Sequence, residues 1–187
     1  MHHVLPVDNE IELRSWRNQD APNLLELILA NRAHLAEWLP WLDQRGNLQQ
    51  VADYITHCQF SAISNKNRFY GIWADNELVG EIARTGTSEG HFFCSMSYWL
   101  GSNAQGRGIV HRAAGRLLQF NFTEMGMNRM EIRVAMGNAR SRQVVERLGF
   151  QYEGYLRQIE WLNDHFVDHE VFSLLRAEWE AQTPAGQ

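Results

Sequence analysis

The chain has 187 residues, of which 44% are hydrophobic and 21% are charged, a globular composition that excludes disordered, collagen-like and low-complexity classes. Seventeen Lys and Arg residues against 22 Asp and Glu residues give a net charge of −5, which disfavours sequence-independent nucleic-acid binding because that binding needs clustered cations. Two cysteines are too few for a disulfide framework. No apolar run approaches the ~20 residues of a membrane span, and no apolar signal core follows Met1. We therefore expect a cytoplasmic protein without a membrane or nucleic-acid partner.

The first third of the chain predicts one strand followed by helices. Residues 11–16 alternate apolar and polar side chains, as a half-buried strand does. Asp20 is placed to cap the helix that follows it. Two more helical segments are expected, one over 34–42, where Pro40 interrupts an aromatic-rich run, and one over 51–60.

Three strands are expected in the middle of the chain. Residues 69–73 and 78–83 are apolar runs joined by a short polar turn, which is typical of a β-hairpin. A stretch rich in Gly, Ser and Thr over 85–90 predicts a second turn, which leads to a strand over 92–100.

A long amphipathic helix and a strand-rich C-terminal region follow. From Val110 the apolar side chains recur at offsets 0, 3, 4, 7, 8, 12 and 15, which fits the period of a helix that stops at Gly126. The elements expected after it are a strand over 130–134, a short helix over 139–148, and a hairpin of 155–162 with 166–175. Mostly antiparallel strands with one strand–helix–strand unit predict a mixed sheet of the α/β class (α+β type) in a single domain.

The loop between the strand 92–100 and the long helix is the first candidate site. Gly106 and Gly108 lie one residue apart at the start of the helix, where main-chain N–H groups and the helix dipole favour a phosphate. The simpler alternative is that the glycines only make a tight turn. A Walker loop is excluded because no Gly-Lys-Ser/Thr follows, and a dinucleotide fingerprint is excluded because His111 stands where its third glycine belongs.

Polar residues after the strand 130–134 and within the strand 155–162 are further candidates. Asn138 stands where a helix cap belongs, with Ser141 in the first turn, so a cap and a solvated serine explain them equally well. Strand alternation puts Gln158 and Glu160 on one face. The Glu160 carboxylate suits either a charge that protects a sheet edge or a general base lining a cleft.

Taken in order, these motifs resemble the GCN5-related N-acetyltransferase (GNAT) superfamily, and within it the branch of RimL/RimJ-type ribosomal-protein N-terminal acetyltransferases. The loop resembles the acetyl-CoA pyrophosphate motif Gln/Arg-x-x-Gly-x-Gly/Ala, with Val110 as a departure at its last position. The resemblance covers residues 10–176 and leaves 1–9 and 177–187 as terminal extensions. The matching segments are Tyr98-Trp99-Leu100, Gln105 to Ile109, Asn138 with Ser141 and Gln143, Gly149-Phe150, Glu153-Gly154, and Glu160 with Leu162-Asn163-Asp164.

The resemblance implies a seven-stranded, mostly antiparallel mixed sheet flanked by about four helices. The sheet is splayed between its fourth and fifth strands, 92–100 and 130–134. It implies acetyl-CoA as cosubstrate, with its pantetheine arm in the splay and its pyrophosphate on the loop. The implied contacts are Ser97, Tyr98, Leu100, Gln105, Gly106, Arg107, Gly108, Ile109, Val110, Asn138 and Ser141.

Acetyl transfer to an amine needs a base, an oxyanion donor and an acid. We assign the base to Glu160, because a carboxylate at a cleft can accept the proton of the amine. A main-chain N–H near Ser97 or Tyr98 is the candidate oxyanion donor. The resemblance gives the acid role to Ser141, since Val145 occupies the place of the tyrosine that many members use.

The acceptor implied by the resemblance is a protein N-terminal α-amine, and a homodimer is possible. The alternatives are a small-molecule amine (a polyamine, amino acid or antibiotic) and a catalytically silent acyl-CoA-binding module. No metal is expected, because His165 and His169 lie ~13 Å apart along a strand. Trp38 and Trp41 suit either the acceptor groove or the core, and core packing is favoured.

Overall fold

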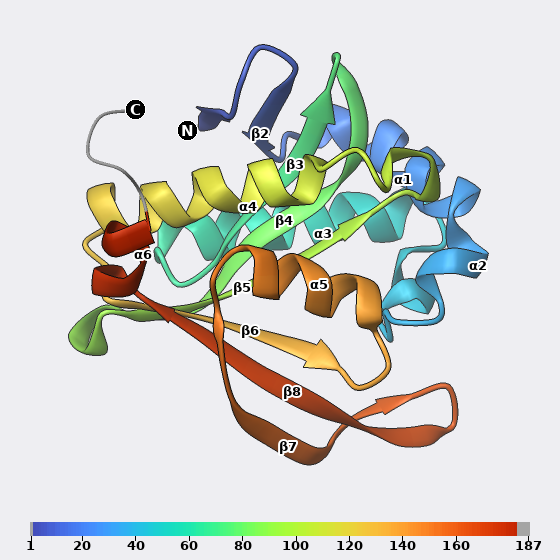
Figure 1. Cartoon of the computed structure of the whole chain (residues 1–187). Helices are drawn as coiled ribbons and strands as arrows, with labels where there is room; N and C mark the ends of the chain where they lie inside the picture. The colour runs from blue at the N-terminus through green and yellow to red at the C-terminus, as the bar shows by residue number, and fades with distance from the viewer. Residues whose placement is uncertain (1, 183–187) are drawn as a thin grey trace.

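The computed structural model describes residues 2–182 and contains one mixed sheet of eight strands in the order β1-β2-β3-β4-β5-β6-β8-β7, with helices on both faces (Figure 1). The strands are β1 (Val4–Pro6), β2 (Ile11–Ser15), β3 (Arg68–Ala74), β4 (Glu77–Ser88), β5 (Phe93–Leu100), β6 (Arg129–Ala135), β7 (Gln151–Leu162) and β8 (His165–Leu175). The α-helices are α1 (Ala21–Ala30), α2 (Arg32–Leu35), α3 (Leu48–Ile63), α4 (Ile109–Gln119), α5 (Ala139–Arg147) and α6 (Arg176–Gln182). The mixed α/β class predicted from the sequence is confirmed.

The N-terminal half of the sheet is an antiparallel run from β1 to β5. Within the segment 1–9, predicted as a terminal extension, Val4–Pro6 pairs with β2 and Leu5 is buried, which adds an eighth strand to the seven expected. At the other end, the predicted extension 177–187 contributes to α6, and its residues 183–187 lie outside the described residues. The domain limits themselves stay a prediction.

β5 and β6 separate soon after they begin to pair. Their parallel ladder has three residue pairs and ends where Ser95 lies opposite Glu131. β6 stays paired with β8 as far as Ala135, and β5 stays paired with β4. Within residues 2–182, no strand pairs with the facing edges of β5 and β6 beyond this ladder. This is the splay predicted between the fourth and fifth strands of the seven-stranded sheet.

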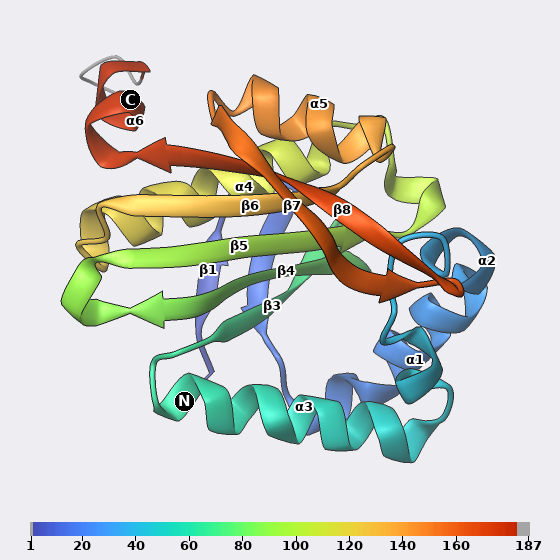
Figure 2. The same cartoon turned by 90° about the horizontal axis from the view of Figure 1, so that it is seen from below.

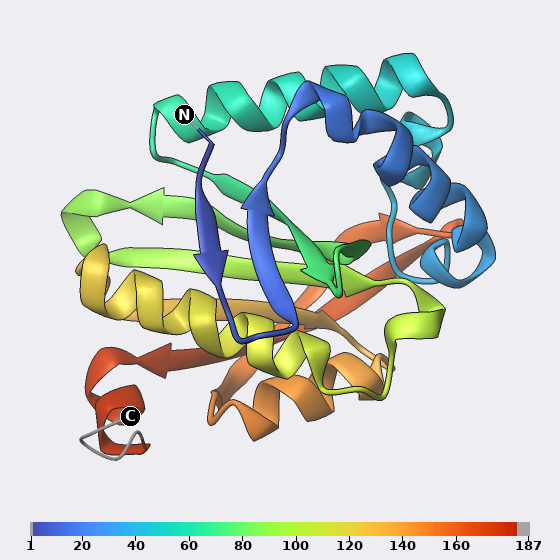
Figure 3. The ribbon, with the colours of Figure 1, turned by 90° about the horizontal axis from the view of Figure 1, so that it is seen from above.

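Helices cover the two faces of the sheet unequally. α4 packs on β1, β2 and β5, and α5 packs on β6, with the larger core beneath them. Figure 3 looks onto this face. α1 and α3 pack on β4 and β3 from the opposite side, around a second core that contains Trp16 and Trp99. Figure 2 looks onto that side, where β6, β8 and β7 continue the sheet beyond α3. The tip of the β7–β8 hairpin reaches the segment after α2, where the Asn163 amide donates to the Ala36 carbonyl at 3.1 Å.

Two segments differ from the sequence prediction. The stretch 85–90, predicted as a turn, is mostly strand, because β4 continues to Ser88. Its threonines favour strand over turn once β5 lies alongside. The segment 34–42 is not one helix, since α2 ends at Leu35. Pro40 lacks the N–H that a continuing helix needs.

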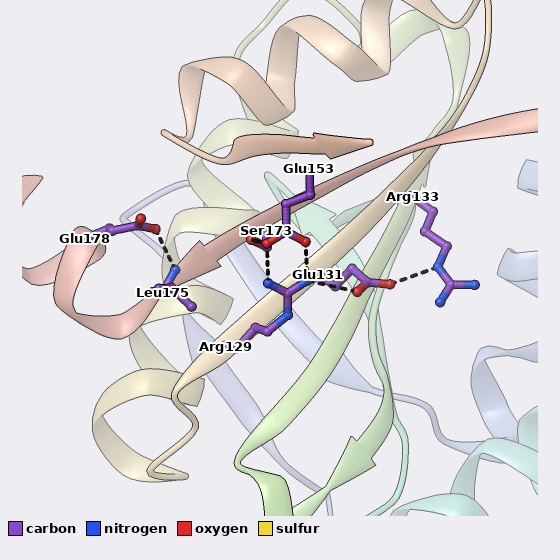
Figure 4. Close-up of polar contacts among 7 residues, drawn as sticks. All are labelled: Arg129, Glu131, Arg133, Glu153, Ser173, Leu175 and Glu178. Carbon is purple, nitrogen blue, oxygen red and sulfur yellow. Dashed lines mark hydrogen bonds and ion pairs between the residues drawn. The ribbon is translucent and has the colours of Figure 1, made fainter. Parts of the chain in front are cut away.

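A polar network ties β6, β7 and β8 together on the face away from α5 (Figure 4). Arg129 donates to both carboxylate oxygens of Glu153, at 2.6 Å each, and to Glu131 at 3.2 Å. The Ser173 hydroxyl donates to Glu153 at 2.7 Å, and Arg133 donates to Glu131 at 2.8 Å. The two-pronged geometry between a guanidinium and a carboxylate is the strong form of this ion pair.

The network predicts an acid-sensitive contribution to stability. Hydrogen bonds from Arg129, and then from Ser173, lower the pKa of Glu153 from 4.5 to about 2. A carboxyl group with a depressed folded-state pKa stabilises the fold above its unfolded pKa, and this stabilisation is lost as the pH falls from about 4.5 toward 2. Because the Glu153 side chain is 42% exposed, we expect Glu153→Gln to lower the free energy of unfolding by less than about 1 kcal/mol at neutral pH. Urea unfolding should show the difference between the two proteins shrinking across this acid range, and a constant difference would contradict the assignment.

Candidate active site

The loop between β5 and α4 leaves open space in front of a helix N-terminus. Gly106 and Gly108 have φ angles of 74° and 71°, in the left-handed region, and Gly108 directly precedes α4. A Cβ atom on either glycine would meet no atom of the described chain within 4 Å. The first N–H groups of a helix lack intrahelical partners, and no described side chain caps α4. This arrangement can bind a phosphate through main-chain atoms.

Of the other loop residues predicted to contact a ligand, two can offer only main-chain atoms and one can offer its side chain. The Ile109 side chain is buried and Val110 packs against the same core, so only their main-chain atoms can reach a ligand. Arg107 is exposed and lies 3.6 Å from Asp75 in the β3–β4 turn. Surface ion pairs of this kind are weak, so the Arg107 guanidinium can exchange this partner for a ligand phosphate.

Gln105 connects the loop to helices on both sides of it. Its amide nitrogen lies 2.6 Å from Nε2 of His34 in α2. Its amide oxygen accepts from Nη1 of Arg140 in α5 at 2.6 Å. Because the loop follows β5 and α5 follows β6, the contact between Gln105 and Arg140 bridges the two strands that separate.

Tyr98 and Ser141 form a second bridge between β5 and α5. The Tyr98 hydroxyl donates to the Ser141 carbonyl at 3.2 Å and lies 3.0 Å from Ser141 Oγ. Burial raises the pKa of Tyr98 to about 12, although the hydrogen bond with Ser141 opposes the shift. The phenol is therefore neutral at neutral pH.

Asn138, Ser97 and Leu100 complete the predicted ligand contacts. Asn138 caps α5, since its Oδ1 accepts from the Ser141 N–H at 3.1 Å. The capping interpretation is thus observed, and a contact of Asn138 with a ligand stays a prediction. Ser97 is exposed and Leu100 is buried, and both lie on the part of β5 that β6 leaves unpaired. The structure thus brings together the loop before α4, the unpaired edge of β5 and the first turn of α5.

Glu160 is placed differently, on the edge strand β7. The strand alternation that predicted Gln158 and Glu160 on one face is interrupted, because β7 is bulged between Leu156 and Glu160. Gln158 has a φ of 52°, and its N–H donates to the Asp168 carboxylate at 2.7 Å. Glu160 hydrogen-bonds to His169 of β8, with 3.0 Å between Oε2 and Nε2.

The two tryptophans of the aromatic segment before α3 lie in different places. Trp41 packs in the second core, 6.0 Å from the ring of Trp99, with the Arg45 guanidinium 3.7 Å from its own ring. Trp38 instead reaches the loop before α5, where its Cη2 would lie 3.9 Å from a Cβ on Gly137. Core packing therefore describes Trp41, whereas a role of Trp38 in an acceptor groove stays a prediction.

Two side-chain partners escaped the sequence reasoning. The Tyr98 hydroxyl contacts Ser141, whereas the sequence suggested only main-chain contacts for this residue. His169 was considered only as a metal ligand, and it contacts Glu160 instead. The alternation of β5 could have indicated the first, since Tyr98 shares a face with core residues Met96 and Leu100.

Neither a metal-binding cluster nor a membrane-spanning helix is found within the described residues. No group of three or more His, Cys, Asp or Glu side chains in residues 2–182 is arranged to hold a metal ion. None of the helices in this part of the chain has the length and hydropathy to cross a bilayer.

Comparison with known proteins gives consistent matches over most of the chain. A family model described as an acetyltransferase (GNAT) domain matches residues 10–151. The provisionally named ribosomal N-acetyltransferase YdaF of Bacillus subtilis (strain 168) is 30% identical over 177 residues, 94% of this chain and 97% of that protein. The ribosomal-protein-serine acetyltransferase of Escherichia coli (strain K12) is 26% identical over 176 residues, which cover 92% of this chain and 97% of that protein.

A solved structure shares both the fold and a detectable sequence similarity. It is the microcin C7 self-immunity acetyltransferase MccE in complex with acetyl-CoA and AMP. The two chains are 26% identical with a TM-score of 0.86, and the match covers 90% of this chain and 94% of the other.

Proposed function

Because the chain belongs to the GNAT family and is an N-acetyltransferase, we propose that acetyl-CoA is its acetyl donor and that its acceptor is the N-terminal α-amine of a ribosomal protein. The main observation in support of acetyl-CoA as donor is the open space at Gly106 and Gly108 before the first turn of α4. This space suits a pyrophosphate, which main-chain N–H groups at a helix N-terminus stabilise. The similar MccE structure contains acetyl-CoA, which supports the same donor.

The proposed donor contacts follow the loop and the splay. Main-chain N–H groups from Gly106 to Val110 hold the pyrophosphate, and Arg107 adds a positive charge. The unpaired edge of β5 from Ser97 to Leu100 supplies main-chain partners for the pantetheine arm, together with Asn138. The donor contributes a thioester, which is the electrophile of the reaction.

Glu160 is the proposed general base. An α-amine has a pKa near ~8 and a lysine amine near ~10.4, so both arrive mainly protonated at neutral pH and must lose a proton before they attack. The Glu160 side chain is 26% exposed and lies on β7, the edge strand of the sheet. It can accept the proton directly or through one water. The amine then attacks without an acyl-enzyme intermediate.

Ser141 is the proposed acid for the departing thiolate. Val145 stands in the place of the tyrosine that many members use, and it is fully buried in the core, so no hydroxyl is available there. The hydroxyl of Ser141 lies 3.0 Å from the neutral Tyr98 hydroxyl, which can hold it in place and share its proton. A main-chain N–H near Ser97 or Tyr98 is the proposed oxyanion donor.

The names of the two sequence relatives, both ribosomal acetyltransferases, support a ribosomal protein as acceptor. A small-molecule amine is the second candidate, because MccE is named for immunity to microcin C7 and is 26% identical to this chain. The net charge of −5 favours a cationic acceptor of either kind. We further propose a cytoplasmic location and a homodimer, and sedimentation velocity tests the second.

An acceptor screen tests this proposal. Synthetic peptides that carry ribosomal-protein N-termini with different first residues, and a set of free amines, are incubated with acetyl-CoA and the enzyme. We expect an intact-mass gain of one acetyl group on a subset of the peptides, with equal release of free CoA thiol. Acetylation of free amines alone would favour the second candidate. Acetyl-CoA binding without turnover of any amine would indicate the silent module.

A further inference from the structure

The closest polar contact of Glu160 lies on the neighbouring strand. His169 Nε2 is 3.0 Å from Glu160 Oε2, and the two side chains are 16% and 26% exposed. An ionised carboxylate can only accept hydrogen bonds, so the imidazole must supply the hydrogen at Nε2. This contact occupies one oxygen of Glu160 and leaves Oε1 without a hydrogen-bond partner within residues 2–182.

The sheet fixes the position of His169 better than that of Glu160. β8 lies between β6 and β7, and His169 is paired with Ala135 on one side and Leu156 on the other. Glu160 instead follows the bulge on an edge strand, where three residues of β7 stand opposite Asp168 alone. A bulge re-aims the side chains beyond it. The imidazole is therefore the fixed partner to which the carboxylate attaches.

The bulge has its own anchor, independent of this contact. The Asp168 carboxylate accepts from the Gln158 N–H at 2.7 Å, with Gln158 in the left-handed conformation. Neighbouring residues of β8 point to opposite faces, so Asp168 holds the backbone of β7 while His169 holds the side chain of Glu160. Removing the imidazole should therefore leave the bulge in place and release only the carboxylate.

We propose that His169 is a positioning residue for acetyl transfer: its Nε2–H fixes the Glu160 carboxylate in the orientation from which Oε1 accepts the proton of the amine. This inference rests on the proposed role of Glu160 as base. Without the imidazole, the carboxylate would sample several rotamers, and only some of them would reach the amine. The loss should appear in kcat, because the loop and β5 that are proposed to bind the donor are untouched.

The test compares His169→Leu with His169→Gln. Leu removes the donor, whereas the Gln side-chain amide offers an N–H at similar reach but cannot titrate. We expect His169→Leu to lower kcat by about tenfold, the effect of losing a hydrogen bond to a charged group, with an unchanged KM for acetyl-CoA. His169→Gln should keep kcat within about threefold of the unchanged enzyme. The matched control is His165→Leu, on the same hairpin, and it should leave kcat unchanged.

Two results would overturn the proposal: full kcat in His169→Leu, or equal losses in the Leu and Gln variants. A readout without turnover separates this failure from failure of the proposed function. In ¹⁵N-edited NMR, the hydrogen-bonded Nε2–H signal of His169 should be present in the unchanged protein and absent from Glu160→Ala. If that signal is present while no amine is acetylated, the proposed function has failed and the contact stands. If it is missing, the positioning role is refuted.

Discussion

Replacing Glu160 by Gln should lower kcat by about 100-fold near neutral pH, with acetyl-CoA affinity within a few fold of the unchanged enzyme. The magnitude is the lower end of what a positioned general base contributes. Gln keeps the size of the side chain and can still accept from His169 through its amide oxygen, so the fold around β7 should persist. What it loses is the ability to take a proton. Steady-state kinetics on the peptide identified by the acceptor screen, with thiol detection of released CoA, measures the effect.

The matched control is Glu153→Gln, the same substitution on the same strand. Glu153 pairs with Arg129 near the other end of β7, so this variant should retain full kcat while it loses a little stability. Full activity of Glu160→Gln would place the base elsewhere. Equal losses in both variants would show that β7 tolerates neither change and that the effect is structural.

The fold could be predicted largely because its elements carry local signals. The helix predicted from Val110 has a clear period and a glycine stop. In the structure α4 and the π-helical turn that follows it, Phe120–Glu124, occupy that segment, and Gly126 has a φ of 66°. The strand Val4–Pro6 escaped prediction because three residues are too short to show alternation, and only pairing with β2 makes them a strand. The same non-local effect turned the threonine-rich end of β4 from a predicted turn into strand.

The same distinction holds for the candidate site, where local features could be predicted and long-range contacts could not. The loop at Gly106 and Gly108 could be predicted, because glycine readily adopts the left-handed conformation that both positions have. The environment of Glu160 could not, because alternation along β7 fails at a bulge whose anchor, Asp168, comes from β8. The contact between Tyr98 and Ser141 joins residues 43 positions apart. It could not be predicted because it depends on the tertiary packing of α5 next to β5.

Replacing Gly108 by Val should weaken acetyl-CoA binding by about 100-fold, which corresponds to ~2.7 kcal/mol. The affinity falls because the added side chain would enter the open space in which the pyrophosphate is proposed to sit. A β-branched residue is also strained at a φ of 71°, which lowers the stability of the free and the bound protein alike. Isothermal titration with acetyl-CoA measures the loss. The peptide KM should change little, because the acceptor is proposed to approach from the Glu160 side.

Gly126→Val separates strain from obstruction. Gly126 has a φ of 66° and no atom within 4 Å of a Cβ, so it matches Gly108 in both respects, but it lies beyond the opposite end of α4. Both variants should therefore lose a similar free energy of unfolding, about 1–2 kcal/mol for a left-handed residue with a side chain. Only Gly108→Val should lose affinity for acetyl-CoA. If both variants bind acetyl-CoA equally well, the pyrophosphate does not sit against the first turn of α4, and the proposed path of the donor through the splay must be abandoned.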